Sequence, residues 1–351
     1  MENQLILIPT IKVHPHQINF YNQVEWNPRK PYREDRHGDS LKEFRRHAHL
    51  LDSTRSPEGK VSKLAKRKIT KAIDYLLLFA SDKTVTSIKT GRKFSFKIAF
   101  ITLTLPSKQI HSDNEIKRTC LNSFIIELQK YEKVKNFIWR AELQRNGNIH
   151  FHIILDKFIP WNVIRNRWNR IVNKLGYVDR YRDSMREFYK DGFKVRKELT
   201  HKWSEGKQRA AYKKNVLTDY HSPNSTDVHS IKNVHNLTHY FVKYLTKNET
   251  NKTSQETEEK ENKKQTGRVW GSSRNLQNIK GASIVLDSEL EAELTDIINK
   301  THCKAYHGDY FSIFYIDFQQ LNLSGGTEIY NRFAEYLVNE FDYNTQLEFL
   351  N

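Results

Sequence analysis

The sequence predicts an α+β protein in which a central antiparallel sheet is covered by helices, with additional segments at both ends of the chain. Two strand-like runs, FIWRAELQ and IHFHIIL, flank an Asn-Gly dipeptide, a pattern typical of a β-hairpin. Stretches with the apolar spacing of helices stand before and after this hairpin. The length of 351 residues and a hydrophobic content of 37% suit about two domains with buried cores.

The chain is expected to begin with a strand and a basic segment. MENQLILIPTIKV combines the acidic Glu2 with a short apolar run, which favours a strand over a signal peptide. Charge-dense residues from Arg29 to Lys71 lead into an amphipathic helix at about Val61–Ala80. KFSFKIAFITLTLP, Lys93–Pro106, alternates aromatic and β-branched residues and predicts a strand that stops at the proline.

Helices should stand on both sides of the hairpin. The capping-box spacing of Ser112 and Glu115 predicts a helix that begins there. WNVIRNRWNRIVNKLG predicts a helix that ends at Gly176. Three basic side chains should be displayed around it: Arg165, Arg167 and Arg170. A further helix is expected at Asn233–Lys247, followed by a polar stretch with the composition of a loop or linker.

The charge of the chain is large and unevenly distributed. Residues 283–351 carry −9 and the whole chain carries +17, so the residues before 283 carry +26. A surplus of this size favours a polyanionic partner, most often nucleic acid, because Lys and Arg that contact phosphates release condensed counterions. The alternative is a basic surface that only keeps the protein soluble.

Cysteine usage and hydropathy bound the compartment. Cys120 and Cys303 provide neither a disulfide framework nor a metal-type spacing, which favours a reducing cytoplasm. No stretch approaches transmembrane length, and no basic amphipathic helix shows an aromatic anchoring face, so we expect no membrane partner.

The hairpin carries the first chemical signal. Side chains at positions i and i+2 of a strand share a face, so His150 and His152 should project together while Phe151, Ile153 and Leu155 face a layer of helices. Two neutral imidazoles side by side can clamp a metal ion. Such a pair on a half-exposed strand can also be merely solvated or hydrogen-bonded.

Glu142 on the preceding strand would complete a metal site under one condition. If Arg145, Asn146 and Gly147 form a three-residue loop with Gly147 in the left-handed conformation, Gln144 pairs with Asn148. Glu142 then lies directly opposite His150. A two-residue loop would instead place Glu142 opposite Phe151, on the wrong face. One carboxylate and two imidazoles suit a divalent ion such as Mg²⁺ or Mn²⁺.

The stretch THYFVKYLTK carries the second signal, a candidate nucleophile. On a helix, the polar side chains fall within an arc of about 100°: Asn236, Tyr240, Lys243, Tyr244 and Lys247. Two phenols one turn apart, each near an ammonium group, suit covalent attack on a phosphodiester. The alternative is that both tyrosines only border the core.

These motifs resemble those of the HUH endonucleases. IHFHIIL resembles their His-hydrophobic-His motif, FITLTLP at Phe100–Pro106 resembles their first motif, and YFVKYLTK resembles their tyrosine motif. The doubled tyrosine is similar to that of rolling-circle replication initiators of small single-stranded DNA phages and some plasmids. GRVWGSSRN, Gly267–Asn275, resembles a segment after the tyrosine helix in those initiators, so Arg268 and Arg274 join the three helical arginines as candidate DNA-binding residues.

The resemblance implies a nicking and joining reaction in a prokaryotic host. A metal held by Glu142, His150 and His152 would polarise the scissile phosphate of single-stranded origin DNA, and Tyr240 or Tyr244 would attack it. The products would be a 5′-phosphotyrosine and a free 3′-OH for a host polymerase. Lys243 and Lys247 would assist the tyrosines. The sequence contains no G-x-x-x-x-G-K-[ST] run, so we expect a host helicase to unwind the duplex.

Three regions and several competing functions follow. We expect a basic N-terminal region over 1–92, the nicking and joining domain over 93–275, and an acidic C-terminal region over 276–351. A transposase or a mobilisation relaxase would use the same chemistry, and a metal-dependent hydrolase would leave the tyrosines idle. A non-catalytic protein that binds single-stranded nucleic acid would explain the charge and could stack bases on Trp139, Trp161 and Trp168.

Overall fold

The computed structural model describes residues 6–25, 61–80, 83–86, 90–96, 98–144, 146–230, 265–277 and 279–341. The chain divides into two compact units. One unit combines Met1–Ser53 with Arg274–Asn351, and the other spans Thr54–Ser273. The second unit contains the hairpin of the two histidines.

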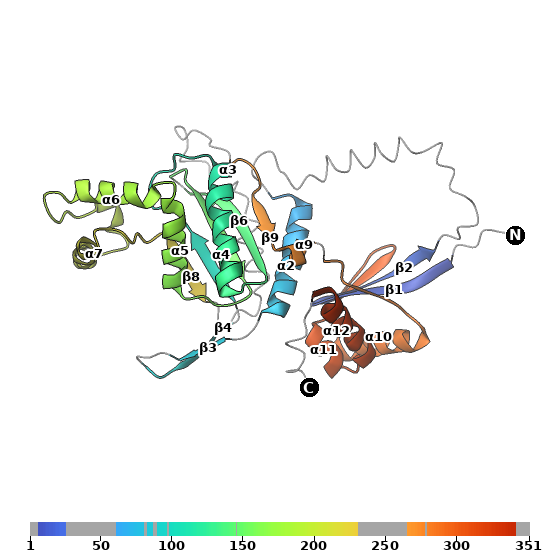
Figure 1. Ribbon diagram of the computed structural model, residues 1–351. Helices are drawn as coiled ribbons and strands as arrows, with labels where there is room; N and C mark the ends of the chain where they lie inside the picture. Colours follow the sequence, from blue (N-terminus) through green and yellow to red (C-terminus); the bar gives the residue numbers. More distant parts are fainter. Residues whose placement is uncertain are drawn as a thin grey trace, which may run out of the picture. The chain divides into compact units, whose positions relative to one another are not determined.

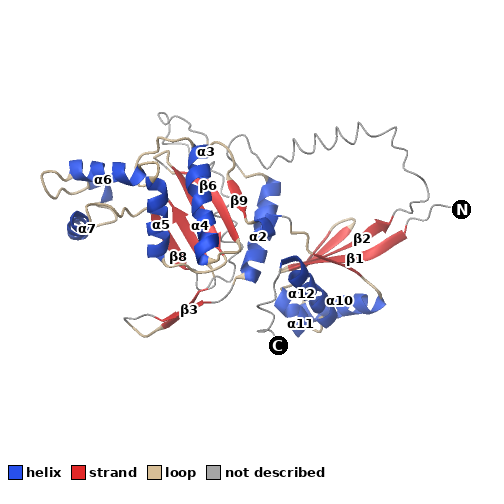
Figure 2. Ribbon diagram, in the orientation of Figure 1, coloured by secondary structure: helices blue, strands red, loops and turns tan. Residues whose placement is uncertain are grey.

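A five-stranded antiparallel sheet forms the centre of this second unit, in the order β8-β5-β7-β6-β9 (Figures 1 and 2). Its strands in chain order are β5 Ala99–Leu103, β6 Phe137–Leu143, β7 Ile149–Leu155, β8 Thr226–Ser230 and β9 Trp270–Ser272. Strand β7 carries the two histidines at the middle of the sheet. The predicted α+β class and the antiparallel sheet are confirmed.

One face of this sheet is apolar and covered by α4 Asn122–Glu132 and α5 Trp161–Asn173 (Figure 2). Phe151 of β7 packs edge-on against Trp168 of α5, with 6.1 Å between ring centroids. Ile153 and Leu155 are also fully buried, as the two-residue period of a strand predicts. Each such side chain contributes about 1.5–3 kcal/mol by leaving water. The histidine face is therefore fixed on the other side of the sheet.

The helix before the hairpin begins where the capping box predicts. Ser112 accepts a hydrogen bond from the Glu115 backbone N–H at 3.2 Å and caps α3 Asp113–Ile116. A π-helical turn, Lys117–Leu121, then joins α3 to α4 without a break in the chain. The loop before this helix is tied to the hairpin, since Gln109 accepts from the Ile149 N–H at 2.6 Å.

Two further predicted helices are confirmed, and the long strand is not. An amphipathic helix α2, Lys63–Phe79, lies within the predicted range Val61–Ala80 and contacts β6. The stretch Lys93–Pro106 forms two strands rather than one. β4 Lys93–Phe96 pairs with β3 Lys83–Thr86 in a separate two-stranded sheet, whereas β5 joins the central sheet. Both halves alternate as strands do, and only their different partners separate them.

The helices after α5 extend from one end of the sheet (Figure 1). Gly176 follows α5 with φ of 73°, as expected for a residue that ends a helix, and α6 begins directly after it. The remaining helical elements of this extension are α6 Tyr177–Phe188, η2 Lys197–Leu199 and α7 Glu205–Leu217.

The other unit joins the first strands of the chain to its C-terminal part. Its antiparallel sheet has the order β10-β1-β2-β12-β11. The strands are β1 Ile6–His14, β2 Gln17–Glu25, β10 Ala282–Val285, β11 Lys304–His307 and β12 Phe311–Tyr315. The strand predicted near the N-terminus is confirmed, but the sequence does not predict its pairing with β10.

Short and long helices complete both units. The described helices of the terminal unit are α9 Arg274–Gln277, α10 Ser288–Thr301, α11 Phe318–Leu323 and α12 Thr327–Phe341. Among all described helices, none combines the length and the apolar character needed to cross a membrane.

Strand β9 approaches the sheet closely enough to require glycine at its centre. Gly271 pairs with Trp139 of β6, and a Cβ atom at Gly271 would lie 2.7 Å from the indole Nε1. We expect Gly271→Ala to lower the free energy of unfolding by about 1–3 kcal/mol, the usual cost of overpacking. Chemical denaturation would measure this change. In a Trp139→Phe background the same substitution should cost less, and additive losses would contradict the proposed clash.

Candidate metal centre

The hairpin loop brings Glu142 opposite His150. Gln144 donates its backbone N–H to the Asn148 carbonyl at 2.8 Å, and the Gly147 N–H donates to the Gln144 carbonyl at 2.9 Å. Gly147 has φ of 79°, in the left-handed region that favours glycine. Glu142 pairs with His150 in the strand register, so the condition set by the sequence is met. Arg145 lies outside the described residues.

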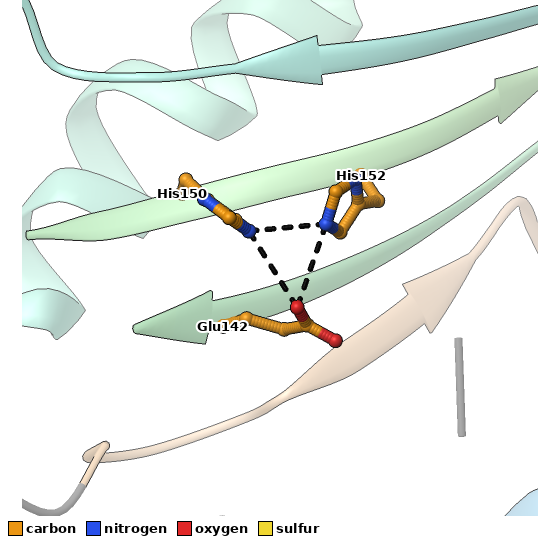
Figure 3. A group of neighbouring side chains, drawn as sticks. All are labelled: Glu142, His150 and His152. Atoms are coloured by element: carbon orange, nitrogen blue, oxygen red, sulfur yellow. Dashed lines mark hydrogen bonds and ion pairs between the residues drawn. The ribbon is translucent and has the colours of Figure 1, made fainter. Parts of the chain in front are cut away.

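Three side chains converge on one point above the sheet (Figure 3). The Glu142 carboxylate lies 3.5 Å from Nε2 of His150 and 3.5 Å from Nε2 of His152. The two Nε2 atoms are 3.0 Å apart. In the described part of the chain, this is the group of metal-ligand side chains whose ligand atoms cluster within 4.8 Å.

The spacing of these three atoms fits a small divalent ion. Ligand atoms that each lie about 2.1 Å from one ion, at angles of about 90–110°, are separated by about 3.0–3.4 Å. The observed separations of 3.0 and 3.5 Å match this geometry. One carboxylate oxygen and two imidazole nitrogens suit Mn²⁺ better than Mg²⁺, because imidazole is a better ligand for the transition metal. The distances alone do not select between the two ions.

Neighbouring groups orient the His152 ring. Its Nδ1 lies 3.1 Å from Oγ1 of Thr102 on β5, the residue directly opposite it in the sheet. With the proton on Nδ1, the ring donates to Thr102 and presents the lone pair of Nε2 to the centre. Phe100 stacks on the same ring at 5.6 Å between centroids. Nδ1 of His150 is buried and has no hydrogen-bond partner among the described residues.

The carboxylate of the centre stays ionised. Burial alone would raise the pKa of Glu142, but hydrogen bonds from His150 and His152 and the charge of Arg140 outweigh it, and together they lower the pKa to about 2. The group is thus an anion at neutral pH and attracts a cation.

Arg140 is a site residue that the motifs did not reveal. It is 2% exposed, lies two residues before Glu142 on the same face, and pairs with His152 in the register. Its Nη1 donates to the Val269 carbonyl at 3.1 Å, which holds the segment before β9 against the centre. The alternation of β6 could have identified it, because every second residue from Glu142 shares the face of the carboxylate.

The candidate nucleophiles fall in a different part of the chain. Tyr240, Tyr244, Lys243 and Lys247, with the helix predicted over Asn233–Lys247, lie outside the described residues. Their roles stay predictions.

The three helical arginines lie on α5, which covers the apolar face of the sheet away from the metal centre. Arg167 donates to the Glu132 carboxylate at 2.7 Å, and Arg170 forms an ion pair with Glu127. Arg165 contacts Asn224. Arg167 and Arg170 also line a cavity of about 570 Å³ between α4 and α5. A role of these arginines in DNA binding stays a prediction.

The remaining predicted arginines lie on either side of β9. Arg268 is exposed, donates to the Trp270 carbonyl at 2.7 Å, and belongs to the unit of the metal centre. Arg274 is also exposed and begins α9 in the terminal unit. Their predicted DNA contacts are likewise not tested by the geometry.

Two of the three tryptophans considered for base stacking belong to the core. Trp139 and Trp168 are 9% and 0% exposed, and Trp168 donates its indole N–H to the Thr104 carbonyl. Neither ring can stack on a base in this structure. Trp161 is 55% exposed, and the Arg165 guanidinium lies 4.5 Å from the centre of its ring.

One known family is similar to the middle of this chain. A family model for the replication-associated protein ORF2 matches residues 98–249. The matched stretch begins just before β5, includes all three residues of the metal centre, and reaches past Tyr244. It supports a role as a replication initiator. Searches of curated proteins and of solved structures give no match.

The Gly147 conformation generates a prediction about the centre. Gly147→Ala forces a Cβ atom into the left-handed region, so we expect a loss of about 1–2 kcal/mol in the free energy of unfolding and weaker Mn²⁺ binding. Gly147→Asn should lose less. The matched control is Gly206→Ala near the start of α7, where a Cβ atom would meet nothing within 4 Å. Equal stability of all three variants in chemical denaturation would contradict this account.

The convergence of ligand atoms generates a second prediction. Mn²⁺ at 100 times its Kd should stabilise the wild type by about 2.7 kcal/mol, seen as a rise in Tm. His150→Ala with His152→Ala should abolish the rise, and Glu142→Gln should reduce it. Replacing two exposed histidines of the same unit, His201 and His221, by alanine should leave the rise unchanged. A full rise in the His150 and His152 variant would place the ion elsewhere.

Proposed function

We propose that this chain initiates rolling-circle replication by nicking and rejoining single-stranded origin DNA. The observation that carries the proposal is the convergence of Glu142, His150 and His152 on one sheet face, within the stretch that matches the replication-associated family. The excess of positive charge before residue 283 suits a DNA substrate.

The metal centre would act on the scissile phosphate. A divalent ion, Mg²⁺ or Mn²⁺, would supply Lewis-acid polarisation of a phosphate oxygen when bound there. The chain itself contributes an ionised carboxylate, two imidazoles that share one face, and Thr102 to hold the His152 ring. Arg140 is too deeply buried to contact DNA, so its part is to position the β9 segment beside the centre.

A tyrosine would supply the covalent step. The phenolic oxygen of Tyr240 or Tyr244 attacks phosphorus, the bond to the 3′ oxygen breaks, and that oxygen takes up a proton. The products are a 5′-phosphotyrosine and a free 3′-OH. Lys243 and Lys247 would stabilise the phenolate or neutralise the phosphate. The phosphodiester energy is kept in the protein link, so the reverse attack by a 3′-OH rejoins the strand without a nucleotide cofactor.

The second tyrosine would serve the end of the cycle. One phenol can hold the first 5′ end while the other cuts the regenerated origin, and we favour Tyr240 for the first cut. A host polymerase would extend the 3′-OH, and a host helicase would open the duplex. A transposase or relaxase would use the same chemistry, and the family match favours replication over both.

Covalent trapping tests this proposal. Incubation with Mn²⁺ and a library of single-stranded oligonucleotides from the replicon that encodes the chain should give a DNA adduct that survives a denaturing gel. Tyr240→Phe and Tyr244→Phe should each retain some adduct if the two residues alternate, and the double variant should form none. An adduct in the double variant would place the nucleophile elsewhere.

Loss of the metal centre should separate cleavage from binding. We expect His150→Ala with His152→Ala to reduce cleavage by at least about 100-fold, the scale of a lost electrostatic stabiliser, while salt-sensitive DNA binding persists. Undiminished cleavage in this variant, or in excess chelator, would remove the metal from the mechanism.

A further inference from the structure

The sheet of the terminal unit is covered on one face only. The side chains of one face are buried beneath α10 and α12, among them Ile11, Val13 and Ile18, each 0% exposed. Residues of the opposite face alternate with them, and many are exposed. In strand β10, for example, Ile284 is 4% exposed and Val285 is 55% exposed. We call this second surface the open face.

Aromatic rings gather on the open face. Tyr21 of β2 and Phe311 of β12 are directly opposite each other, and Phe311 is 43% exposed. Tyr306 of β11 is 56% exposed, and its ring lies 5.9 Å from that of Phe311. Tyr315, four residues after Phe311 on the same face, is 51% exposed. Four rings on adjoining strands form a continuous patch, unlike the scattered apolar residues of an ordinary surface.

The polar side chains of the open face are basic or neutral. Lys12 lies between the aromatic rows, with its Nζ 6.0 Å from the centre of the Tyr21 ring, and Lys304 is directly opposite Tyr315. Asn19 and Gln17 occupy the adjacent positions of β2 and share a hydrogen bond of 3.0 Å. The described strand side chains of this face include no carboxylate.

The carboxylates of this unit concentrate on the helices behind the sheet. They are Glu289, Glu291, Glu293 and Asp296 on α10 and Glu328, Glu335 and Glu340 on α12. The negative charge of the C-terminal part is therefore separated by the sheet from a face that carries two lysines. An anionic partner would be repelled by the helical side and accepted by the open face.

We propose that the open face binds single-stranded DNA through stacking of its bases on Tyr21, Tyr306, Phe311 and Tyr315. Aromatic rings on a sheet with nearby cations are the elements by which proteins hold unpaired bases and their phosphates. Lys12 and Lys304 would neutralise phosphates. An apolar protein partner or a second copy of this face would bury Lys12, Asn19 and Gln17 without partners, which is unfavourable. The inference does not depend on cleavage by the metal centre.

Binding of a non-cleavable probe tests the stacking role. We expect the full chain with Tyr306→Ala, Phe311→Ala and Tyr315→Ala to bind a fluorescent oligothymidylate at least about tenfold more weakly, from the loss of several base-ring stacks. Excess chelator keeps the metal centre silent, and fluorescence anisotropy at two salt concentrations gives the affinity. The loss should persist at the higher salt, because stacking depends less on salt than phosphate contacts do.

Two matched variants control for general damage. Leu323→Ala removes an 87% exposed apolar side chain on α11, outside the sheet, and should leave affinity unchanged. Lys304→Gln should weaken binding and lower its salt dependence, whereas Lys300→Gln at the end of α10 should do neither. Equal affinities of the triple variant and the wild type would overturn the proposal.

Photocrosslinking locates the DNA directly. An oligonucleotide with 5-iodouracil should crosslink to peptides that contain Tyr306, Phe311 or Tyr315, both in the wild type and in the Tyr240→Phe, Tyr244→Phe variant that cannot nick. Crosslinks confined to residues 54–273 would overturn the proposal. Concentration-dependent protection of the open face without DNA would also overturn it, by showing that a second copy covers the face. Crosslinks at the open face without any cleavage would leave this inference standing and reject only the nicking reaction.

Discussion

The hydrogen bond from Gln144 to Asn148 fixes the register on which the candidate site depends. With that pair closed and Gly147 at positive φ, Glu142 lies opposite His150, and the two-residue period of the strands then places His152 and Arg140 on the same face. A slip of one residue would move Glu142 to the apolar side. A single backbone conformation in the loop therefore determines whether three ligands meet.

The packed face of the sheet secures this register from the other side. Phe151 and Ile153 would have to leave the core under α4 and α5 for the strand to shift, at a cost of about 1.5–3 kcal/mol for each side chain. The ligands themselves contribute little to this stability, because their side chains are partly exposed and share one charged centre. The apolar residues between the histidines thus hold the metal face in place, although they take no part in its chemistry.

Local patterns predicted the parts of the structure that depend on local spacing. Ser112 caps a helix, the Asn-Gly loop closes a hairpin, and alternation in β7 separates ligands from core. The long strand was wrong because β4 and β5 read alike and differ only in their distant partners. The ion pairs of Arg167 and Arg170 with α4 were not foreseen, since helical spacing shows that a side chain is displayed but not what it faces. Arg140 required the register of two strands at once.

The order of the strands in the terminal unit has a consequence for synthesis of the chain. β1 and β2 are made first, yet their partners β10 and β12 follow only after the whole unit of the metal centre. At about 5–20 residues per second, the N-terminal hairpin waits on the order of ten seconds or more on the ribosome before both of its edges can be paired. Open strand edges invite pairing with other chains. Nascent chains of this protein therefore carry an aggregation risk that the finished fold removes, and translation rate becomes a determinant of its yield.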